Sequence, residues 1–201
     1  MNLDGYALPI KKLKGTEPIE SLDLSGKNLG VASTIVIASL ISVNGSLTSL
    51  NLGNNQLCGL DQYGDGTYTA KGITAIADAL CVSGSLTSLN LGNNQLCGLD
   101  QYGDGTYTAK GITAIADALC VSGSLTSLDI HCNNIVGDGA AKLSAAVLGN
   151  LKIEMFNELP IKEMRADSFT ELDLKWKFCG VEGAMVVAGL IPVMGVLTKM
   201  E

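Results

Sequence analysis

Imidazole, aromatic and basic groups are scarce in this chain. Its 201 residues include one histidine (His131), one tryptophan and 4% aromatic residues. The 20 acidic side chains outnumber the 13 basic ones and give a net charge of −7. A single histidine excludes chemistry that requires two imidazoles, and the acidic balance disfavours nucleic acid and anionic membranes as main partners. We therefore expect no enzymatic activity and no cofactor.

Long apolar segments are also missing. The longest, Ala184 to Leu197, has 14 residues and contains Pro192, whereas a membrane-spanning helix needs about 20. The N-terminus lacks the basic and apolar regions of a signal peptide. Six cysteines at regular positions are too few for a disulfide-stapled secreted protein. These features favour a cytoplasmic protein with reduced thiols and no membrane partner.

The chain is rich in internal repeats. Residues 46–84 and 85–123 are identical over 39 residues, and a third copy begins at Ser124 before it diverges. Because the identity extends over loop positions that packing would not fix, it records a recent duplication. Repeats of this length are typical of solenoids, in which each unit buries its apolar face against the next.

Each copy contains the pattern L-x-x-L-x-L-x-x-N-x-L, from Leu47 to Leu57 and from Leu86 to Leu96. A version with isoleucines runs from Leu125 to Ile135, and related units begin at Ile19 and Phe169. The L-x-L core predicts a short strand whose alternate side chains point inward. After each strand, apolar residues at helical spacing predict a helix, for example over 70–80.

The asparagine of the pattern predicts a buried ladder of Asn55, Asn94 and Asn133. Its amide offers donors and an acceptor to backbone groups that a turning chain leaves unpaired. Lysine, with no acceptor and a charge that resists burial, cannot replace it. Since Lys27 and Lys177 take this position in the outer units, we expect the ladder to be interrupted there.

This spacing resembles that of leucine-rich repeat proteins. The strand starts lie 28, 39 and 39 residues apart, and a unit near 28 with a full helix is similar to the ribonuclease-inhibitor-like class. The resemblance implies an α/β fold: a curved horseshoe with a parallel sheet on the concave face and helices on the convex face. That class includes inhibitors, GTPase regulators, actin-capping proteins and sensor regions of immune receptors.

The expected organisation is an N-terminal capping segment over residues 1–18, followed by repeats over 19–201. A longer echo aligns residues 41–48 with 191–198 at a constant offset of 150, so another repeat opens at Leu197. Repeat arrays normally end in a polar capping unit. We therefore expect an array that is incomplete at its C-terminus, either a segment of a longer array or a truncated gene product. Self-association through the uncapped repeat is a further expectation.

Two inserted loops are candidate binding elements. Subtracting 28 from 39 leaves 11 extra residues in each identical repeat, over 59–69 and 98–108, and Asp65-Gly66 and Asp104-Gly105 predict small hairpins there. Tyrosine gives a large contact area at low entropic cost. The alternative is that the tyrosines pack on their own repeat. The four tyrosines are Tyr63, Tyr68, Tyr102 and Tyr107.

The outward positions of the strands form a second candidate surface. They are small and polar, with a mild acidic bias, and lack the Trp, Tyr and Arg of binding hot spots. This face is either solvated without a tight ligand or binds a basic or polar protein surface. Its candidate binding residues are Asn51, Asn90, Asp129, His131 and Asp173.

We expect no metal site. The loop from Asp61 has Tyr63 and Gly72 where a calcium-binding EF-hand needs Asp or Asn and Glu. The pair His131-Cys132 lacks the further ligands of a zinc site. The repeated cysteines, Cys58, Cys81, Cys97 and Cys120, are expected to be buried or semi-buried apolar residues.

The sequence thus favours a scaffold or recognition module that binds another protein without catalysis. One alternative, based on the resemblance, is a regulatory subunit or inhibitor of the GTPase-activator or ribonuclease-inhibitor kind. Another is a spacer within a larger sensor protein.

Overall fold

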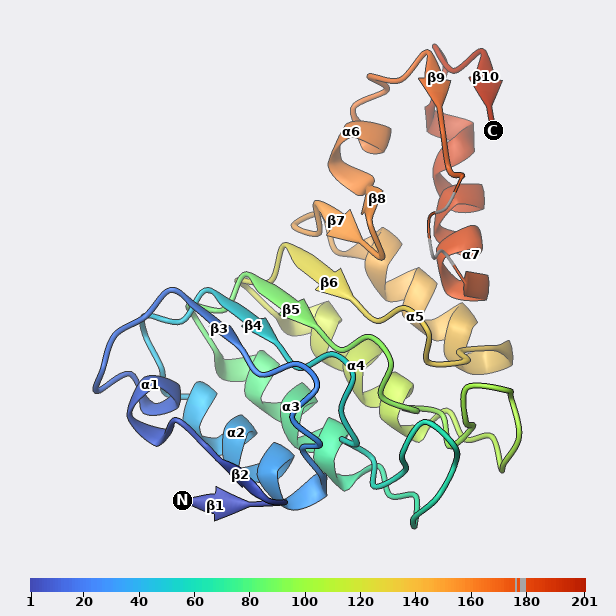
Figure 1. Cartoon of the computed structure of the whole chain (residues 1–201). Helices are drawn as coiled ribbons and strands as arrows, with labels where there is room; N and C mark the ends of the chain where they lie inside the picture. The colour runs from blue at the N-terminus through green and yellow to red at the C-terminus, as the bar shows by residue number, and fades with distance from the viewer. Residues whose placement is uncertain (176, 178–179) are drawn as a thin grey trace.

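Short parallel strands occur at each L-x-L core in the computed structural model, which describes residues 1–175, 177 and 180–201 (Figure 1). Ser21 pairs with Ser49, Ser49 with Ser88 and Ser88 with Ser127, so each repeat advances the sheet by one strand. The register therefore follows the sequence repeat. The strands are β3 (Ser21–Asp23), β4 (Ser49–Asn51), β5 (Ser88–Asn90) and β6 (Ser127–Asp129).

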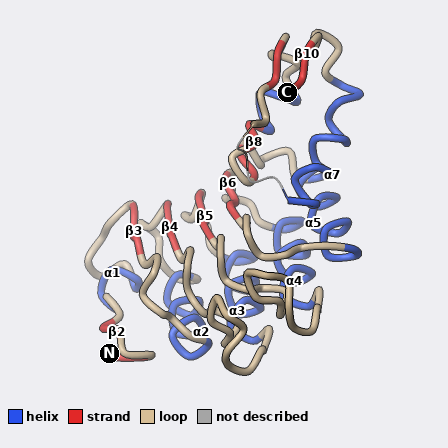
Figure 2. Tube along the Cα trace, turned by 45° about the vertical axis from the view of Figure 1, so that its right-hand side comes forward, coloured by secondary structure: helices blue, strands red, loops and turns tan. Residues whose placement is uncertain are grey.

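Helices form a second layer beside the strands (Figure 2). Five of them pack in series, each against the next. Their apolar faces, such as Ile73, Ile76 and Leu80, are at most 1% exposed and meet the inward leucines of the strands. The predicted strand–helix units are confirmed. The five helices are α2 (Val31–Ile41), α3 (Lys71–Val82), α4 (Lys110–Val121), α5 (Gly137–Gly149) and α7 (Gly180–Leu190).

The strand layer is divided, which the repeat pattern did not anticipate. After β6, β7 (Met155–Phe156) pairs in parallel with it, but β8 (Leu159–Pro160) turns back antiparallel to β7. A proline has no N–H to donate to a further strand, so β8 ends this sheet. β9 (Glu171–Leu172) then pairs with β10 (Lys199–Met200) in a separate parallel sheet. The 3-10 helix η1 (Ile191–Val193) precedes β10.

The sequence echo corresponds to a duplicated structural module. A hairpin, a short helix, a strand and a long helix occur in that order at both ends of the chain. The two hairpin turns, Asp4-Gly5 and Asn157-Glu158, have positive φ at both residues, as a type I′ turn requires. The first module contains β1 (Asn2–Leu3), β2 (Tyr6–Ala7) and α1 (Ile10–Lys14), and the second contains β7, β8 and α6 (Ile161–Arg165).

The first hairpin is joined to the first repeat by polar contacts. Asp4 Oδ2 accepts hydrogen bonds from the N–H groups of Gly30 (2.9 Å) and Ser33 (3.2 Å) at the N-terminus of α2. Leu8 and Leu13 are buried in the core. The segment expected to cap the array therefore packs on the first repeat, and a similar unit recurs inside the chain. Among the described residues, no helix is long and apolar enough to cross a membrane.

Candidate functional site

The predicted strand-face residues lie where the strands end and use their oxygens locally. Asn51 Oδ1 accepts the N–H of Gly53 at 2.9 Å, and Asn90 Oδ1 accepts that of Gly92 at 2.8 Å. This is the Asx-turn, in which a side chain binds the backbone two residues on. Equivalent bonds join Asp129 to the N–H of His131 (3.2 Å) and Asp173 to that of Lys175 (2.8 Å).

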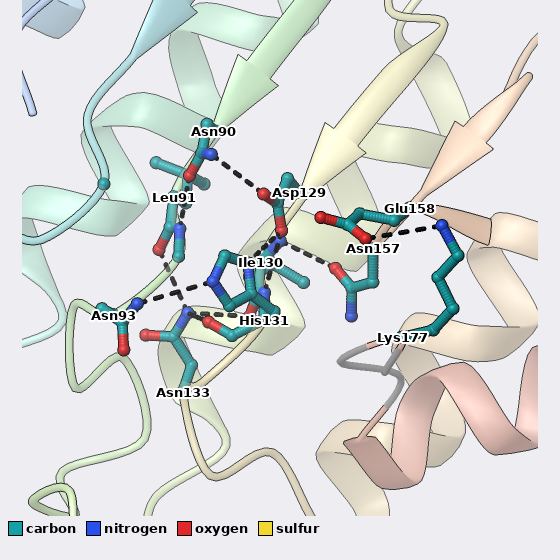
Figure 3. Close-up of polar contacts among 12 residues, drawn as sticks. Asn90, Leu91, Asn93, Asp129, Ile130, His131, Asn133, Asn157, Glu158 and Lys177 are labelled. Atoms are coloured by element: carbon teal, nitrogen blue, oxygen red, sulfur yellow. Dashed lines mark hydrogen bonds and ion pairs between the residues drawn. The ribbon is translucent and has the colours of Figure 1, made fainter. Parts of the chain in front are cut away.

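Asp129 also gathers the polar side chains in the middle of this face (Figure 3). Its Oδ1 lies 2.5 Å from His131 Nδ1, and its Oδ2 accepts a hydrogen bond from Asn90 Nδ2 at 2.9 Å. His131 Nε2 faces Asn93 Nδ2 at 3.5 Å. A Cβ at Gly92 would approach the imidazole to 2.7 Å, so glycine is what makes room for the ring.

A buried carboxyl group near this cluster was not predicted from the sequence. Glu182, on α7, is 3% exposed, and its Oε1 accepts a hydrogen bond from Asn157 Nδ2 at 3.0 Å. Burial raises the pKa of Glu182 to about 7, against the opposing effects of this hydrogen bond and of His131. Asn157 Oδ1 accepts the N–H of Ile130 at 2.8 Å. The second hairpin thus links β6 to α7.

No nucleophile–base pair or metal centre emerges from these groups. Within the part of the chain that the structure describes, no three His, Cys, Asp or Glu side chains are arranged to hold a metal ion. His131 bonds to Asp129, while the neighbouring Cys132 is exposed. Burial raises the pKa of Cys132, which leaves less of the reactive thiolate.

The pattern asparagines form a buried row with repeated backbone contacts. Each side-chain nitrogen donates to three carbonyl oxygens; for Asn94 these belong to Leu52, Leu91 and Gly92, all at 3.0 Å. The side-chain oxygen of Asn133 accepts the N–H groups of Asn94 and Leu96. In the same way, the side-chain oxygen of Asn55 accepts those of Lys27 and Leu29. Asn55, Asn94 and Asn133 are 4%, 0% and 2% exposed.

Asn94 departs from this arrangement, because its Oδ1 is buried without a hydrogen-bond partner among the described residues. The cause lies in the equivalent turn of the preceding repeat, which contains Gln56. Gln95 has φ +50°, whereas its counterpart Gln56 is not in the left-handed region, and the N–H of Gln56 donates to Leu29 O instead. Two identical sequences therefore adopt different turns.

The inserted loops fold back on themselves as small hairpins. Leu60 bridges Gly66, and Leu99 bridges Gly105, in antiparallel fashion. In the first loop, however, the turn comes before Asp65-Gly66, the pair that predicted it. Asp61 Oδ1 accepts the N–H groups of Tyr63 (2.9 Å) and Asp65 (3.0 Å), so the Asp61 side chain closes the turn.

The two tyrosines of each loop have different surroundings. The Tyr68 hydroxyl donates to Leu96 O at 2.8 Å, and the Tyr107 hydroxyl donates to Val136 O at 2.6 Å, so each ties its loop to the following repeat. Tyr63 and Tyr102 are 59% and 74% exposed. The loops also contact each other, since Gln101 N–H donates to Gln62 O at 3.2 Å.

The repeated cysteines also form one buried pair and one exposed pair. Cys58 and Cys97 are fully buried, and burial raises the pKa of each thiol to about 12. Cys81 and Cys120 are exposed, so the expectation of burial is wrong for this pair. They stand near the ends of α3 and α4.

Sequence and structure together define a leucine-rich repeat protein, with a parallel sheet of repeated strands and stacked helices. The leucine-rich repeat family matches residues 46–64 and 85–103. No curated protein sequence matches the chain.

Several solved structures share this fold, among them the following two. The structure titled leiomodin-1 actin-binding site 2 has 18% sequence identity and a TM-score of 0.60, covering 92% of this chain and 87% of that one. The tropomodulin C-terminal domain of Caenorhabditis elegans has 12% identity and a TM-score of 0.56, covering 92% and 90%. At these identities the likeness concerns the fold.

Proposed function

We propose that this chain is a non-catalytic recognition module, of the ribonuclease-inhibitor-like class, that binds another protein through its two inserted loops. The observation that carries the proposal is the pairing of roles within each loop. Tyr68 and Tyr107 fasten the loops to the repeats, while Tyr63 and Tyr102 stand exposed at equivalent places. Exposed tyrosines on a fixed scaffold provide contact area without a large ordering cost.

The strand face contributes a polar margin to this surface. Asn51, Asn90 and Asp129 already use side-chain oxygens in Asx-turns, so they offer few free acceptors to a partner. His131 lies on the same face, beside Asp129, whereas Asp173 follows β9 in the separate sheet and is not part of this margin. Because the chain carries a net charge of −7, a partner surface with basic or neutral polar groups is favoured.

The experiment compares two double variants in affinity capture from the native lysate. The Tyr63→Ser/Tyr102→Ser protein should lose its partner and keep its melting temperature, because exposed side chains are replaced. The Tyr68→Ser/Tyr107→Ser protein should melt at a lower temperature, because two hydrogen bonds and partly buried rings are lost. Equal capture by the wild type and the first variant would refute the tyrosine loops as the binding element.

Actin is the first defined partner to test. The leiomodin-1 structure is titled for an actin-binding site, and that title describes the other protein. Cosedimentation of the chain with filamentous actin, and a binding assay with monomeric actin, should each be run with the Tyr63→Ser/Tyr102→Ser control. Binding that this variant retains would place an actin contact outside the loops.

A further inference from the structure

A polar cavity of about 280 Å³ lies between the two inserted loops and the turns that follow β3, β4 and β5. Its wall consists almost entirely of primary amides, with Asp61 and Tyr63 beside them. Six of these amide side chains have no hydrogen-bond partner among the described residues. They are Asn28, Asn54, Gln56, Gln62, Gln95 and Gln101.

Gln95 presents its amide to the cavity. The residue is only 5% exposed, and its side-chain amide makes no hydrogen bond to the described protein. The side-chain atoms that are buried without a partner in the described residues are Ser33 Oγ and Asn94 Oδ1, so the Gln95 amide keeps contact with solvent. Since Gln95 lines the cavity, a molecule inside the cavity can pair with its donors and acceptor in place of water.

The wall chemistry selects the kind of ligand. No Lys, Arg or His lines the cavity, which disfavours phosphates and carboxylates. The single carboxylate, Asp61, already accepts two backbone N–H groups, which disfavours a metal cation. The scarcity of apolar side chains disfavours a lipid.

Primary amides both donate and accept hydrogen bonds, and so do the hydroxyl groups of a sugar. The exposed ring of Tyr63, which also lines the cavity, provides a flat face beside these amides for the C–H side of a sugar ring. The volume of about 280 Å³ lies just below that of typical ligand pockets, roughly 300 to 1,000 Å³, and suits a single ring.

We propose that this cavity binds one ring of a neutral saccharide. The cavity shares Tyr63 with the surface proposed for protein binding, and it requires two neighbouring loop-bearing repeats, because it takes Gln62 from the first loop and Gln101 from the second. The third repeat has no such loop, and Tyr102, although identical in sequence context to Tyr63, is not on the wall. The duplication itself thus supplies a matched control.

The experiment titrates the full chain, labelled with ¹⁵N, with free neutral sugars: glucose, galactose, mannose, N-acetylglucosamine and their disaccharides. At least one should cause saturable shifts confined to the cavity residues. Gln62→Ala and Tyr63→Ser should weaken that binding by roughly fivefold or more, as loss of a direct contact does. Tyr102→Ser should leave it unchanged. Gln62, Tyr63 and Tyr102 are exposed, so these variants should fold.

Three results would overturn the proposal. The first is no saturable response to any sugar in the panel. The second is equal or tighter binding of glucose-6-phosphate or glucuronate, which would mean that neutral hydroxyls are not what the site selects. The third is saturation by a glutamine-rich peptide and not by sugars, which would assign the amides to peptide recognition. Because free sugars are used, none of these results depends on whether the loops bind a protein.

Discussion

At the scale of single residues, asparagine occupies two different positions in each of the two identical repeats. In the buried row its amide nitrogen donates to carbonyls of its own turn and of the preceding repeat, as in Asn133 with Ile130 O and Leu91 O. At the strand ends its oxygen accepts a backbone N–H, as in Asn90 with Gly92. In the buried row, the oxygens of Asn55 and Asn133 also accept N–H groups, but those belong to the preceding repeat. The strand-end asparagines instead accept an N–H of their own turn.

Alanine substitutions at two members of the buried row should lower the free energy of unfolding by different amounts. Asn133→Ala removes both the three donated bonds and the acceptor for Asn94 and Leu96 N–H groups. Asn94→Ala removes donated bonds only, because its Oδ1 has no partner among the described residues. Asn133→Ala should therefore be more destabilising by about 1–3 kcal/mol in urea unfolding. Equal losses would mean that Asn94 Oδ1 is also bonded in solution.

Thiol labelling of the native protein should follow burial. Iodoacetamide should modify Cys81, Cys120 and Cys132, which are exposed, and leave Cys58 and Cys97 unmodified until urea unfolds the chain. The thiolate is the reactive form, and a pKa of about 12 at the buried pair suppresses it. Mass spectrometry of the peptides measures this. Rapid native labelling of Cys58 or Cys97 would contradict the packing of the turns after β4 and β5.

Sequence patterns at this scale predicted the positions of these residues better than their contacts. The spacing of Asn55, Asn94 and Asn133 is read directly from the repeats. The unpaired oxygen of Asn94 is not, because residues 54–56 and 93–95 are identical. What differs is the neighbouring repeat. The repeat before Asn55 has Lys27 and Asn28 in its turn, and its Leu29 O accepts the N–H of Gln56.

At the scale of elements, the second hairpin adds side-chain contacts between the strand layer and the helix layer. Its Asn157 accepts the N–H of Ile130, next to β6, and donates to Glu182 on α7. Arg165, on α6, donates to the carbonyls of Val147 and Leu148 at the end of α5. The hairpin module thus fixes how α5, α6 and α7 meet.

Glu182 should make stability depend on pH. The pKa of about 7 in the folded chain lies above the ordinary value of 4.5, so its protonated form stabilises the fold. That contribution is fully present below pH 4.5 and is lost as pH rises through 7. The group accounts for about 3 kcal/mol across this window. Glu182→Gln, which mimics the protonated acid, should remove this component and should be more stable than the wild type at pH 8.

Urea unfolding of both proteins between pH 4.5 and pH 8 measures this effect. The matched control is Glu158→Gln, since Glu158 is next to Asn157, the partner of Glu182, but is exposed and pairs with Lys177 at 3.6 Å. A difference between wild type and Glu182→Gln that stays constant with pH would contradict a buried, protonated Glu182.

Sequence reasoning at the element scale succeeded where local rules dominate. Strands, helices and the inserted hairpins follow from residue periodicity and turn residues. The different roles of Tyr63 and Tyr68 could not be predicted in this way, because Tyr68 is fixed by Leu96 O, 28 residues further along the chain. The burial of Glu182 depends likewise on Asn157.

At the scale of the whole molecule, the helix layer is more continuous than the strand layer. The helices α2, α3, α4, α5 and α7 pack in series, whereas the repeat strands form one sheet from β3 to β8 and another of β9 and β10. Repeat periodicity predicted the stacking but not this break, since β8 and Pro160 come from a module repeated at the longer offset. The inserted loops project from the uninterrupted part (Figure 1).

We propose the loops over 59–69 and 98–108 as the surface that recognises another protein. Amide hydrogen exchange of the chain, free and bound to its captured partner, tests this assignment. The expected result is slower exchange in both loops on binding, with the outward faces of α3 and α4 unchanged. Protection confined to α3 and α4, with both loops exchanging as in the free chain, would contradict the claim.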